Sequence, residues 1–163
     1  MKNKVFGYIT RMSGGMRQVL VYSNRHQPES GIQIPGGTVE PGEKEEETLY
    51  REIEEESGLV HLRFVGKLGK TIHKKPLRKE TWHFFQVESL ESPAHHWVHR
   101  VSSFGKDDGN VYEFFWMPIA EAQKKLAKGQ TDFLNQLSDP IPGKSETAPA
   151  TFSGATLPSL NAE

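Results

Sequence analysis

The sequence predicts a single domain of mixed α/β class, with helices interspersed among segments that are largely β. The chain has 163 residues and no internal repeat, a length that suits one domain with a full core but is short for two. Short runs rich in β-branched and aromatic residues recur between Gly and Pro residues, as is typical of strands. Two other segments carry a helical pattern instead.

The N-terminal part predicts a β-hairpin followed by a short strand. Residues 5–11 alternate loosely and are rich in β-formers, and residues 17–22 form a stronger candidate strand. The Ser-Gly-Gly sequence at 13–15 supplies the positive φ angles of a tight turn between them. Residues 31–34 predict another short strand, which we expect the Pro-Gly-Gly sequence at 35–37 to stop.

A helix is predicted at residues 44–57, with Gly58 placed to end it in a left-handed conformation. Further strands are predicted at 62–72, 81–87 and 111–117. Pro118 breaks the last strand, and a helical pattern then runs from residue 119 to about residue 137. Gly129 interrupts the middle of that second helix.

We expect the folded domain to span residues 1–137. From residue 138 to residue 163 the composition shifts to Pro, Ser, Thr, Ala and Gly, with single apolar residues and no period. Such a segment is either a flexible tail or an arm that packs on a partner subunit, and the sequence leaves both open.

Composition excludes several functional classes. The absence of cysteine rules out disulfides, thiolate catalysis, iron–sulfur clusters and cysteine-based zinc sites. No apolar stretch approaches the roughly 20 residues needed to cross a bilayer, and the N-terminus lacks the apolar run of a signal peptide. We therefore expect a cytoplasmic protein that has no membrane partner.

The charge is distributed unevenly along the chain. The segment from Glu40 to Glu56 holds nine glutamates against two basic residues, whereas the rest has eighteen basic residues against twelve acidic ones. An acidic segment in a moderately basic protein predicts a site for a divalent cation, with basic residues around it to receive phosphate.

Helical geometry gathers three of these carboxylates. At 3.6 residues per turn, Glu52, Glu55 and Glu56 project along one side, next to an apolar stripe of Leu49 and Ile53. Like charges at these spacings destabilise a helix by roughly 0.2–0.5 kcal/mol per pair. A hard cation such as Mg²⁺ accounts for them, because it binds carboxylates, keeps several waters and accepts phosphate oxygens.

Two further features of this segment suggest supporting roles. Arg51 can pair with Glu47 or Glu55 one turn away, or reach Glu43 at the start of the helix. The glycines allow a sharp turn of the preceding loop, so that a backbone carbonyl near Gly36 joins the ligands of the metal. A solvated glutamate-rich face is the alternative, but the residues also meet a long gapped pattern.

That pattern begins at Gly37 and ends at Leu59. It runs Gly, five residues, Glu43, seven residues, and then Arg-Glu-Ile-Glu-Glu-Glu-Ser-Gly-Leu from Arg51. It resembles the complete signature of the Nudix hydrolase family, which includes MutT-like proteins: Gly-x5-Glu-x7-Arg-Glu-U-x-Glu-Glu-x-Gly-U, where U is bulky and aliphatic. Every specified position is met, so the chain is identified as a member.

The resemblance implies a fold and a reaction. The fold is an α/β/α sandwich around a mixed β-sheet, with the signature as loop–helix–loop. The reaction is the metal-dependent hydrolysis of the diphosphate linkage in a small nucleotide, a nucleoside diphosphate linked to a group X. The cofactor is Mg²⁺ or Mn²⁺, and a homodimer is expected from the family alone.

The resemblance also implies residue roles. Glu52, Glu55 and Glu56 are metal ligands and catalytic residues, joined by the carbonyl of Gly36, and Glu52 is a candidate base. Glu113 in the last β segment is a speculative further ligand. The structural positions of the signature are Gly37, Glu43, Arg51 and Gly58.

The substrate is less well defined. Candidate phosphate-binding residues are Arg17, Arg25, Lys74 and Arg78. The positions that carry a marker proline in ADP-ribose hydrolases and a marker tyrosine in dinucleoside polyphosphate hydrolases are Lys74 and Lys75 here. Asp107-Asp108-Gly109 is interpreted only as a turn, and the histidines of residues 95–99 as a loop or short strand near the site entrance.

Other activities remain open at this point. A nucleoside triphosphate pyrophosphatase that clears oxidised nucleotides and an RNA 5′-pyrophosphohydrolase share the same chemistry. RNA is the least supported substrate, because no platform for single-stranded RNA is evident. A module that senses nucleotides without cleaving them, or one that acts only through the tail, is disfavoured because all the signature carboxylates are intact.

Overall fold

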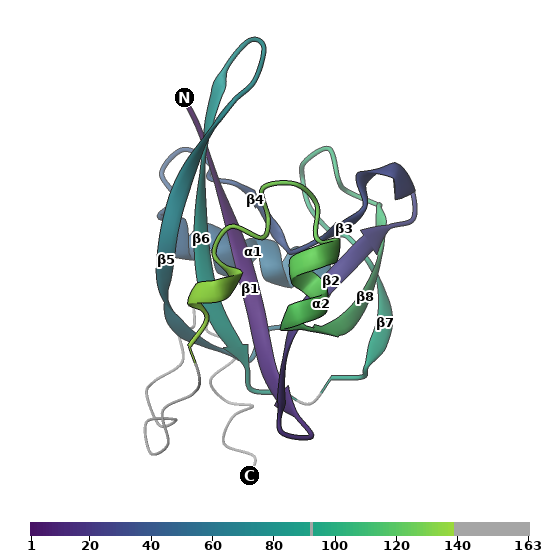
Figure 1. Cartoon of the computed structure of the whole chain (residues 1–163). Coiled ribbons are helices and arrows are strands. Elements are labelled where there is room, and N and C mark those ends of the chain that lie inside the picture. The colour runs from purple at the N-terminus through teal and green to yellow at the C-terminus, as the bar shows by residue number, and fades with distance from the viewer. Residues whose placement is uncertain (92, 139–163) are drawn as a thin grey trace.

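A mixed eight-stranded β-sheet forms the centre of the molecule, with α1 on one face and α2 on the other (Figure 1). The structure is a computed structural model that describes residues 1–91 and 93–138. The helices and strands are β1 (Lys2–Ser13), β2 (Met16–Asn24), β3 (Ile32–Gln33), β4 (Gly36–Thr38), α1 (Glu45–Ser57), β5 (Leu62–Lys74), β6 (Lys79–Ser89), β7 (His96–Arg100), β8 (Val111–Pro118) and α2 (Ile119–Lys125), with 3-10 turns at Pro28–Ser30 and Leu134–Gln136. The predicted mixed α/β sandwich is confirmed.

The sheet is ordered β5-β6-β1-β2-β8-β7. β1 is parallel to β6 and antiparallel to β2, so the predicted N-terminal hairpin is confirmed. Near its beginning β1 also pairs with β4, where Val5 lies opposite Gly37. The Pro-Gly-Gly sequence therefore does not simply stop a strand as predicted, because its two glycines start a new one.

Side-chain alternation along β1 divides the core into two layers. Val5 and Ile9 face α1 and pack with Leu49 and Ile53 of that helix. Phe6 and Tyr8 point to the opposite face and pack with the α2 side of the molecule. This follows from the period of two in a β-strand, which sends successive side chains to opposite faces.

The predicted boundaries of α1 are confirmed. Lys44 lies at its N-cap and donates its backbone N–H to Oε1 of Glu47 at 3.0 Å. Gly58 ends the helix with φ at +83° and donates its amide to the carbonyl of Glu54. Leu49 and Ile53 are fully buried, so helix burial against the sheet supplies most of the stability of α1.

The second helix is much shorter than predicted. α2 ends at Lys125, and Gly129 takes a φ of +87°, which a continued helix does not allow. The chain instead crosses the sheet as an irregular segment, where Tyr8 donates its hydroxyl to the carbonyl of Gln130 at 2.6 Å. Gln130 in turn accepts the amide of Ile34. These long-range hydrogen bonds replace those of the predicted helix.

The predicted tail, residues 138–163, lies outside the described residues except for Ser138. Ser138 exchanges two hydrogen bonds with the buried side chain of Gln86. Among residues 1–91 and 93–138, no helix combines the length and apolar character that a membrane span requires.

We expect Gly7→Val to destabilise the domain by about 1–3 kcal/mol, the usual cost of overpacking a core. A Cβ at Gly7 would already lie 3.0 Å from Cδ1 of Leu49 and 3.4 Å from Cδ1 of Ile53. Urea unfolding measures the change. Gly66→Val is the matched control, because open space surrounds that position on β5, and equal losses in both variants would contradict the close approach of α1.

Candidate active site

Helix α1 places Glu52 and Glu56 against the backbone of β4. The two residues are only 8% and 2% exposed. The amide of Gly36 donates to Oε1 of Glu56 at 3.1 Å. A Cβ at Gly37 would overlap the carboxyl group of Glu52. Glycine at that position is therefore what lets the carboxylate of Glu52 lie directly on the strand.

Asp107 completes a group that we call the carboxylate cluster: Glu52, Glu56 and Asp107. One oxygen atom from each of the three residues lies within 4.8 Å of the others. Asp107 comes from the loop between β7 and β8, and the hydroxyl of Ser103 donates to its Oδ1 at 2.7 Å. The sequence predicted only a turn here, which is present, because the amide of Asp108 donates to the carbonyl of Gly105.

Burial and mutual repulsion raise the pKa values of the cluster. Loss of solvent raises the pKa of Glu52 to about 7, against the lowering effect of Arg51 and with further raising by Glu55 and Asp107. Burial, and then Glu52, raise the pKa of Glu56 well above its ordinary range. Such crowding of buried anions is relieved by a cation.

The ligand chemistry of the cluster suits a hard divalent ion. Carboxylate oxygens are what Mg²⁺ and Mn²⁺ prefer, and Mg²⁺ takes only a few of them. The hydrogen bond that Glu56 accepts from Gly36 comes from a neutral backbone amide, which does not compensate the charge of the carboxylate when it is ionised. The residues therefore fit a divalent cation held between α1 and the β7–β8 loop.

Arg51 joins the start of the signature to its acidic face. Its Nε and NH2 donate to the two oxygens of Glu43 at 2.6 and 2.9 Å. Its NH1 donates to Glu52 at 3.1 Å and to Glu55 at 3.2 Å. The paired guanidinium lowers the pKa of Glu43 to about 2. Of the three partners considered from the sequence, Glu43 and Glu55 contact Arg51, whereas Glu47 binds the amide of Lys44.

Glu55 and Glu113 lie outside the carboxylate cluster. Glu55 is half-buried beside Arg51. Burial raises the pKa of Glu55 above its ordinary value, although Arg51 opposes this rise. Tyr112 of β8 packs on the α1 side of the sheet. Because successive side chains in a strand point to opposite faces, the side chain of Glu113 projects from the face away from α1. There it pairs with His96 at 2.6 Å and Arg25 at 3.2 Å. These partners, His96 first, lower its pKa.

The predicted phosphate-binding residues are scattered. Arg17 pairs in register with Met12, far along β1 from the Val5–Gly37 pair, and donates to the carbonyl of Leu137. Lys74 is the exposed last residue of β5. Arg78, in the turn between β5 and β6, donates to the buried carboxylate of Glu80. The structure does not bring these residues to the carboxylate cluster.

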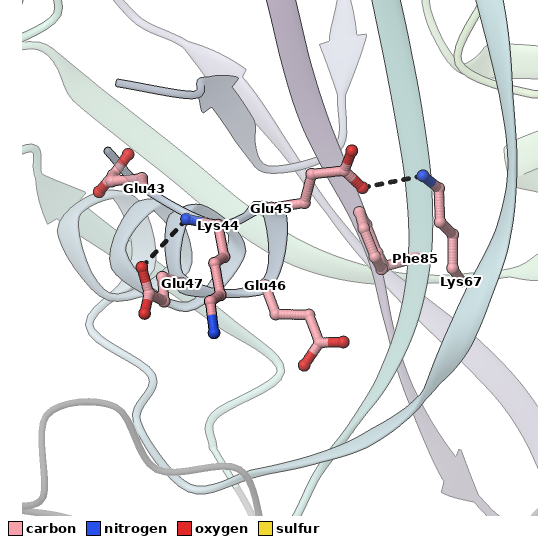
Figure 2. Close-up of a pocket in the computed structure, with 7 residues that line it drawn as sticks. All are labelled: Glu43, Lys44, Glu45, Glu46, Glu47, Lys67 and Phe85. Carbon is pink, nitrogen blue, oxygen red and sulfur yellow. Dashed lines mark hydrogen bonds and ion pairs between the residues drawn. The ribbon is translucent and has the colours of Figure 1, made fainter. Parts of the chain in front are cut away.

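A depression of about 700 Å³ lies beside the first turn of α1, and Figure 2 shows the residues that line it. Its lining residues are Glu43, Lys44, Glu45, Glu46, Glu47, Lys67 and Phe85. Lys67 spans it to reach Glu45 at 2.8 Å. The depression shares no lining residue with the carboxylate cluster, and its four glutamates disfavour an anionic ligand.

The fold and the signature helix define a known family. The sequence profile of the NUDIX domain matches residues 2–137, so the chain belongs to the Nudix family. A Mycobacterium tuberculosis protein named MutT4 is 27% identical over 110 residues, which cover 66% of this chain. The Bacillus subtilis protein YtkD, named as an 8-oxo-dGTP diphosphatase, is 36% identical over 66 residues, 39% of this chain. The matched parts span 41% of the length of each relative.

Solved structures share the fold at lower identity. The Nudix domain of Shewanella oneidensis NrtR, complexed with ADP ribose, has a TM-score of 0.61 at 15% identity, covering 82% of this chain and 84% of that one. The C. elegans Ap4A hydrolase has a TM-score of 0.59 at 17% identity, covering 83% and 90%. A UDP-X diphosphatase has a TM-score of 0.57 at 18% identity, covering 83% and 61%. At these identities the likeness establishes the fold alone.

We expect Gly37→Ala to weaken Mn²⁺ binding by about 10- to 100-fold, the usual cost of misplacing the support of a metal ligand. The new methyl group would occupy the position of the Glu52 carboxyl group. Mn²⁺ titration followed by electron paramagnetic resonance measures the affinity. Gly66→Ala serves as the control, and undiminished Mn²⁺ affinity in Gly37→Ala would show that Glu52 does not depend on this glycine.

We expect Glu43→Gln to cost roughly 1.5–3 kcal/mol of unfolding free energy at neutral pH, the range for a hydrogen bond to a charged group. The pKa of Glu43 is about 2 in the folded protein against an ordinary 4.5, so its contribution is complete above about pH 5 and is lost as the pH falls toward 2. Urea unfolding of both proteins at pH 7 and pH 3 tests this.

The difference between wild type and Glu43→Gln should therefore shrink at pH 3. Glu46→Gln, at an exposed position in the same first turn of α1, should leave stability nearly unchanged at both pH values. A difference for Glu43→Gln that is constant with pH would mean that the charge of Glu43 is not what stabilises the pair.

Proposed function

We propose that this protein is a divalent-metal-dependent pyrophosphohydrolase that cleaves the diphosphate linkage of a nucleoside diphosphate-X, such as a nucleotide sugar or ADP-ribose. One observation carries the proposal: Glu52, Glu56 and Asp107 converge to within 4.8 Å although two of them are buried. Nothing in the packing of the core calls for three converging anions, whereas cation-assisted hydrolysis does.

Glu52, Glu56 and Asp107 would hold Mg²⁺ or Mn²⁺, with Glu55 and the carbonyl of Gly36 as further ligands. When bound, the cation neutralises the diphosphate and lowers the pKa of water. Glu52 is the candidate base, because its carboxylate belongs to the carboxylate cluster, beside which the attacking water would be held. Arg51 orients Glu52 through a hydrogen bond from its NH1 group. The same NH1 group binds Glu55, and its positive charge reduces the repulsion between Glu55 and Glu52.

The names of similar proteins support a phosphoanhydride of a nucleotide as the substrate class. The solved structures are of an Ap4A hydrolase, a UDP-X diphosphatase and a domain in complex with ADP ribose. A nucleoside triphosphate pyrophosphatase is the second candidate, which the 8-oxo-dGTP diphosphatase name of YtkD favours. Both activities use the same carboxylate cluster and differ in the group that leaves.

The test is hydrolysis of a nucleotide panel with Mg²⁺, with products separated. The panel contains ADP-ribose, UDP-glucose, Ap4A, dGTP, 8-oxo-dGTP and triphosphorylated RNA. We expect turnover that EDTA abolishes. Preference for ADP-ribose or UDP-glucose supports the first candidate, and preference for 8-oxo-dGTP supports the second. Full turnover in excess EDTA would contradict both.

We expect Glu56→Gln to reduce kcat/KM by at least about 100-fold and Asp107→Asn to weaken Mn²⁺ binding by about 10- to 100-fold. Each change removes a charged oxygen ligand while keeping the size of the side chain. Glu54→Gln is the matched control, because Glu54 is exposed on the same helix. Near-normal turnover and Mn²⁺ binding in Glu56→Gln would remove the carboxylate cluster from the mechanism.

A further inference from the structure

The loop between β7 and β8 carries an unusual aromatic residue. Phe104 has a relative exposure of 109%, so it is as accessible to solvent as in an extended chain. Phenylalanine is among the residues most often buried in folded proteins. Its ring therefore contributes nothing to the packing of the described residues and is available to a ligand.

The backbone on both sides of Phe104 is nevertheless held in place. The amide of Ser103 donates to Oδ1 of Asp108 at 3.0 Å, and the amide of Gly105 donates to the hydroxyl of Ser103 at 3.1 Å. At the base of the loop, the amide of Val101 donates to the carbonyl of Asn110 at 2.8 Å. A ring on an anchored backbone loses less freedom on binding than one on a loose segment.

The same loop reaches the carboxylate cluster. Asp107 follows Phe104 by three residues, a separation of at most about 11 Å even in a fully extended chain. Lys106, between them, is exposed. A planar apolar ring, a cation and a metal-binding carboxylate therefore occupy four consecutive residues, a set that matches the base, the phosphates and the bound cation of a nucleotide.

We propose that this loop recognises the substrate: Phe104 stacks on the base, Lys106 pairs with a phosphate, and Asp107 positions the cation. The proposal rests on the proposed function and narrows it, because it requires a substrate that carries a base rather than a base-free phosphoanhydride. Phe104 is then a specificity-determining residue that raises affinity for the nucleoside, since every base offers a face for stacking.

The chain offers matched controls for both side chains. Leu77 is 97% exposed in the turn of the β5–β6 hairpin, which projects beyond the rest of the sheet (Figure 1). Lys79 is exposed at the start of β6. Neither residue shares a loop with a member of the carboxylate cluster.

The experiment compares Phe104→Ala, Phe104→Trp and Leu77→Ala on the best nucleotide of the panel. We expect Phe104→Ala to raise KM about tenfold, the scale of one lost base stack, with kcat unchanged because the stack is equal in ground and transition states. Phe104→Trp should restore the wild-type KM, and Leu77→Ala should leave it unchanged. Thermal unfolding confirms that each variant is folded.

Inorganic tripolyphosphate, a base-free competitive inhibitor, separates the two contacts. Its inhibition constant should be unchanged in Phe104→Ala but should rise in Lys106→Ala, whereas Lys79→Ala should leave it unchanged. Mn²⁺ affinity should be the same in all of these variants. Equal loss of nucleotide and tripolyphosphate binding in Phe104→Ala would overturn the stacking role.

An active wild type whose KM is unchanged in Phe104→Ala would overturn this inference while the proposed function stands. If the elution volume of that variant also changes, the ring instead contacts a second copy of the chain. If instead the wild type hydrolyses no nucleotide, the proposed function fails, and calorimetric titration with ADP-ribose still tests whether Phe104→Ala weakens nucleotide binding.

Discussion

The close approach of α1 to the sheet is the constraint on which the rest of the structure depends. It is possible because two strands present glycine at the contact: Gly7 of β1 lies under Leu49 and Ile53, and Gly37 of β4 lies under Glu52. Burial of Leu49 and Ile53 on one stripe of the helix fixes its position on the sheet. The adjoining stripe places the carboxylates of Glu52 and Glu56 against the backbone of β4. The apolar stripe and the carboxylate stripe lie less than half a turn apart, so the same helix can both pack on the sheet and carry the carboxylate groups.

The same approach creates an electrostatic cost that Arg51 offsets in part. Its guanidinium is shared among Glu43, Glu52 and Glu55, and its closest contact is with Glu43, which lies outside the carboxylate cluster. This arrangement stabilises the folded helix without neutralising Glu56 or Asp107. A divalent cation bound to the carboxylate cluster would compensate the charge that these residues carry when they are ionised.

The sequence predicted what depends on short-range spacing. Helix α1, its end at Gly58 and the pairing of Arg51 with Glu43 all follow from a local pattern. Asp107 escaped prediction because it reaches α1 only through the pairing of β7 with β8, and the loop signal of Asp-Asp-Gly describes the turn equally well. Glu113 lies in a predicted strand, but only the alternation of side chains along β8, taken with the packing of Tyr112, places its side chain on the face away from α1.

The members of the carboxylate cluster come from two parts of the chain with different packing restrictions. The signature helix and β4 determine two members of the carboxylate cluster, and their backbone geometry leaves no room for other side chains at Gly37. The third member, Asp107, belongs to a loop in which Ser102, Phe104, Gly105, Lys106 and Asp108 are exposed and meet no such packing restriction. Movement of that loop would affect both the cation and the substrate, whereas replacement of Phe104 alone would affect only the substrate. Because the loop lies outside the signature, substitutions in it that alter the proposed substrate contacts would leave the proposed catalytic helix undisturbed.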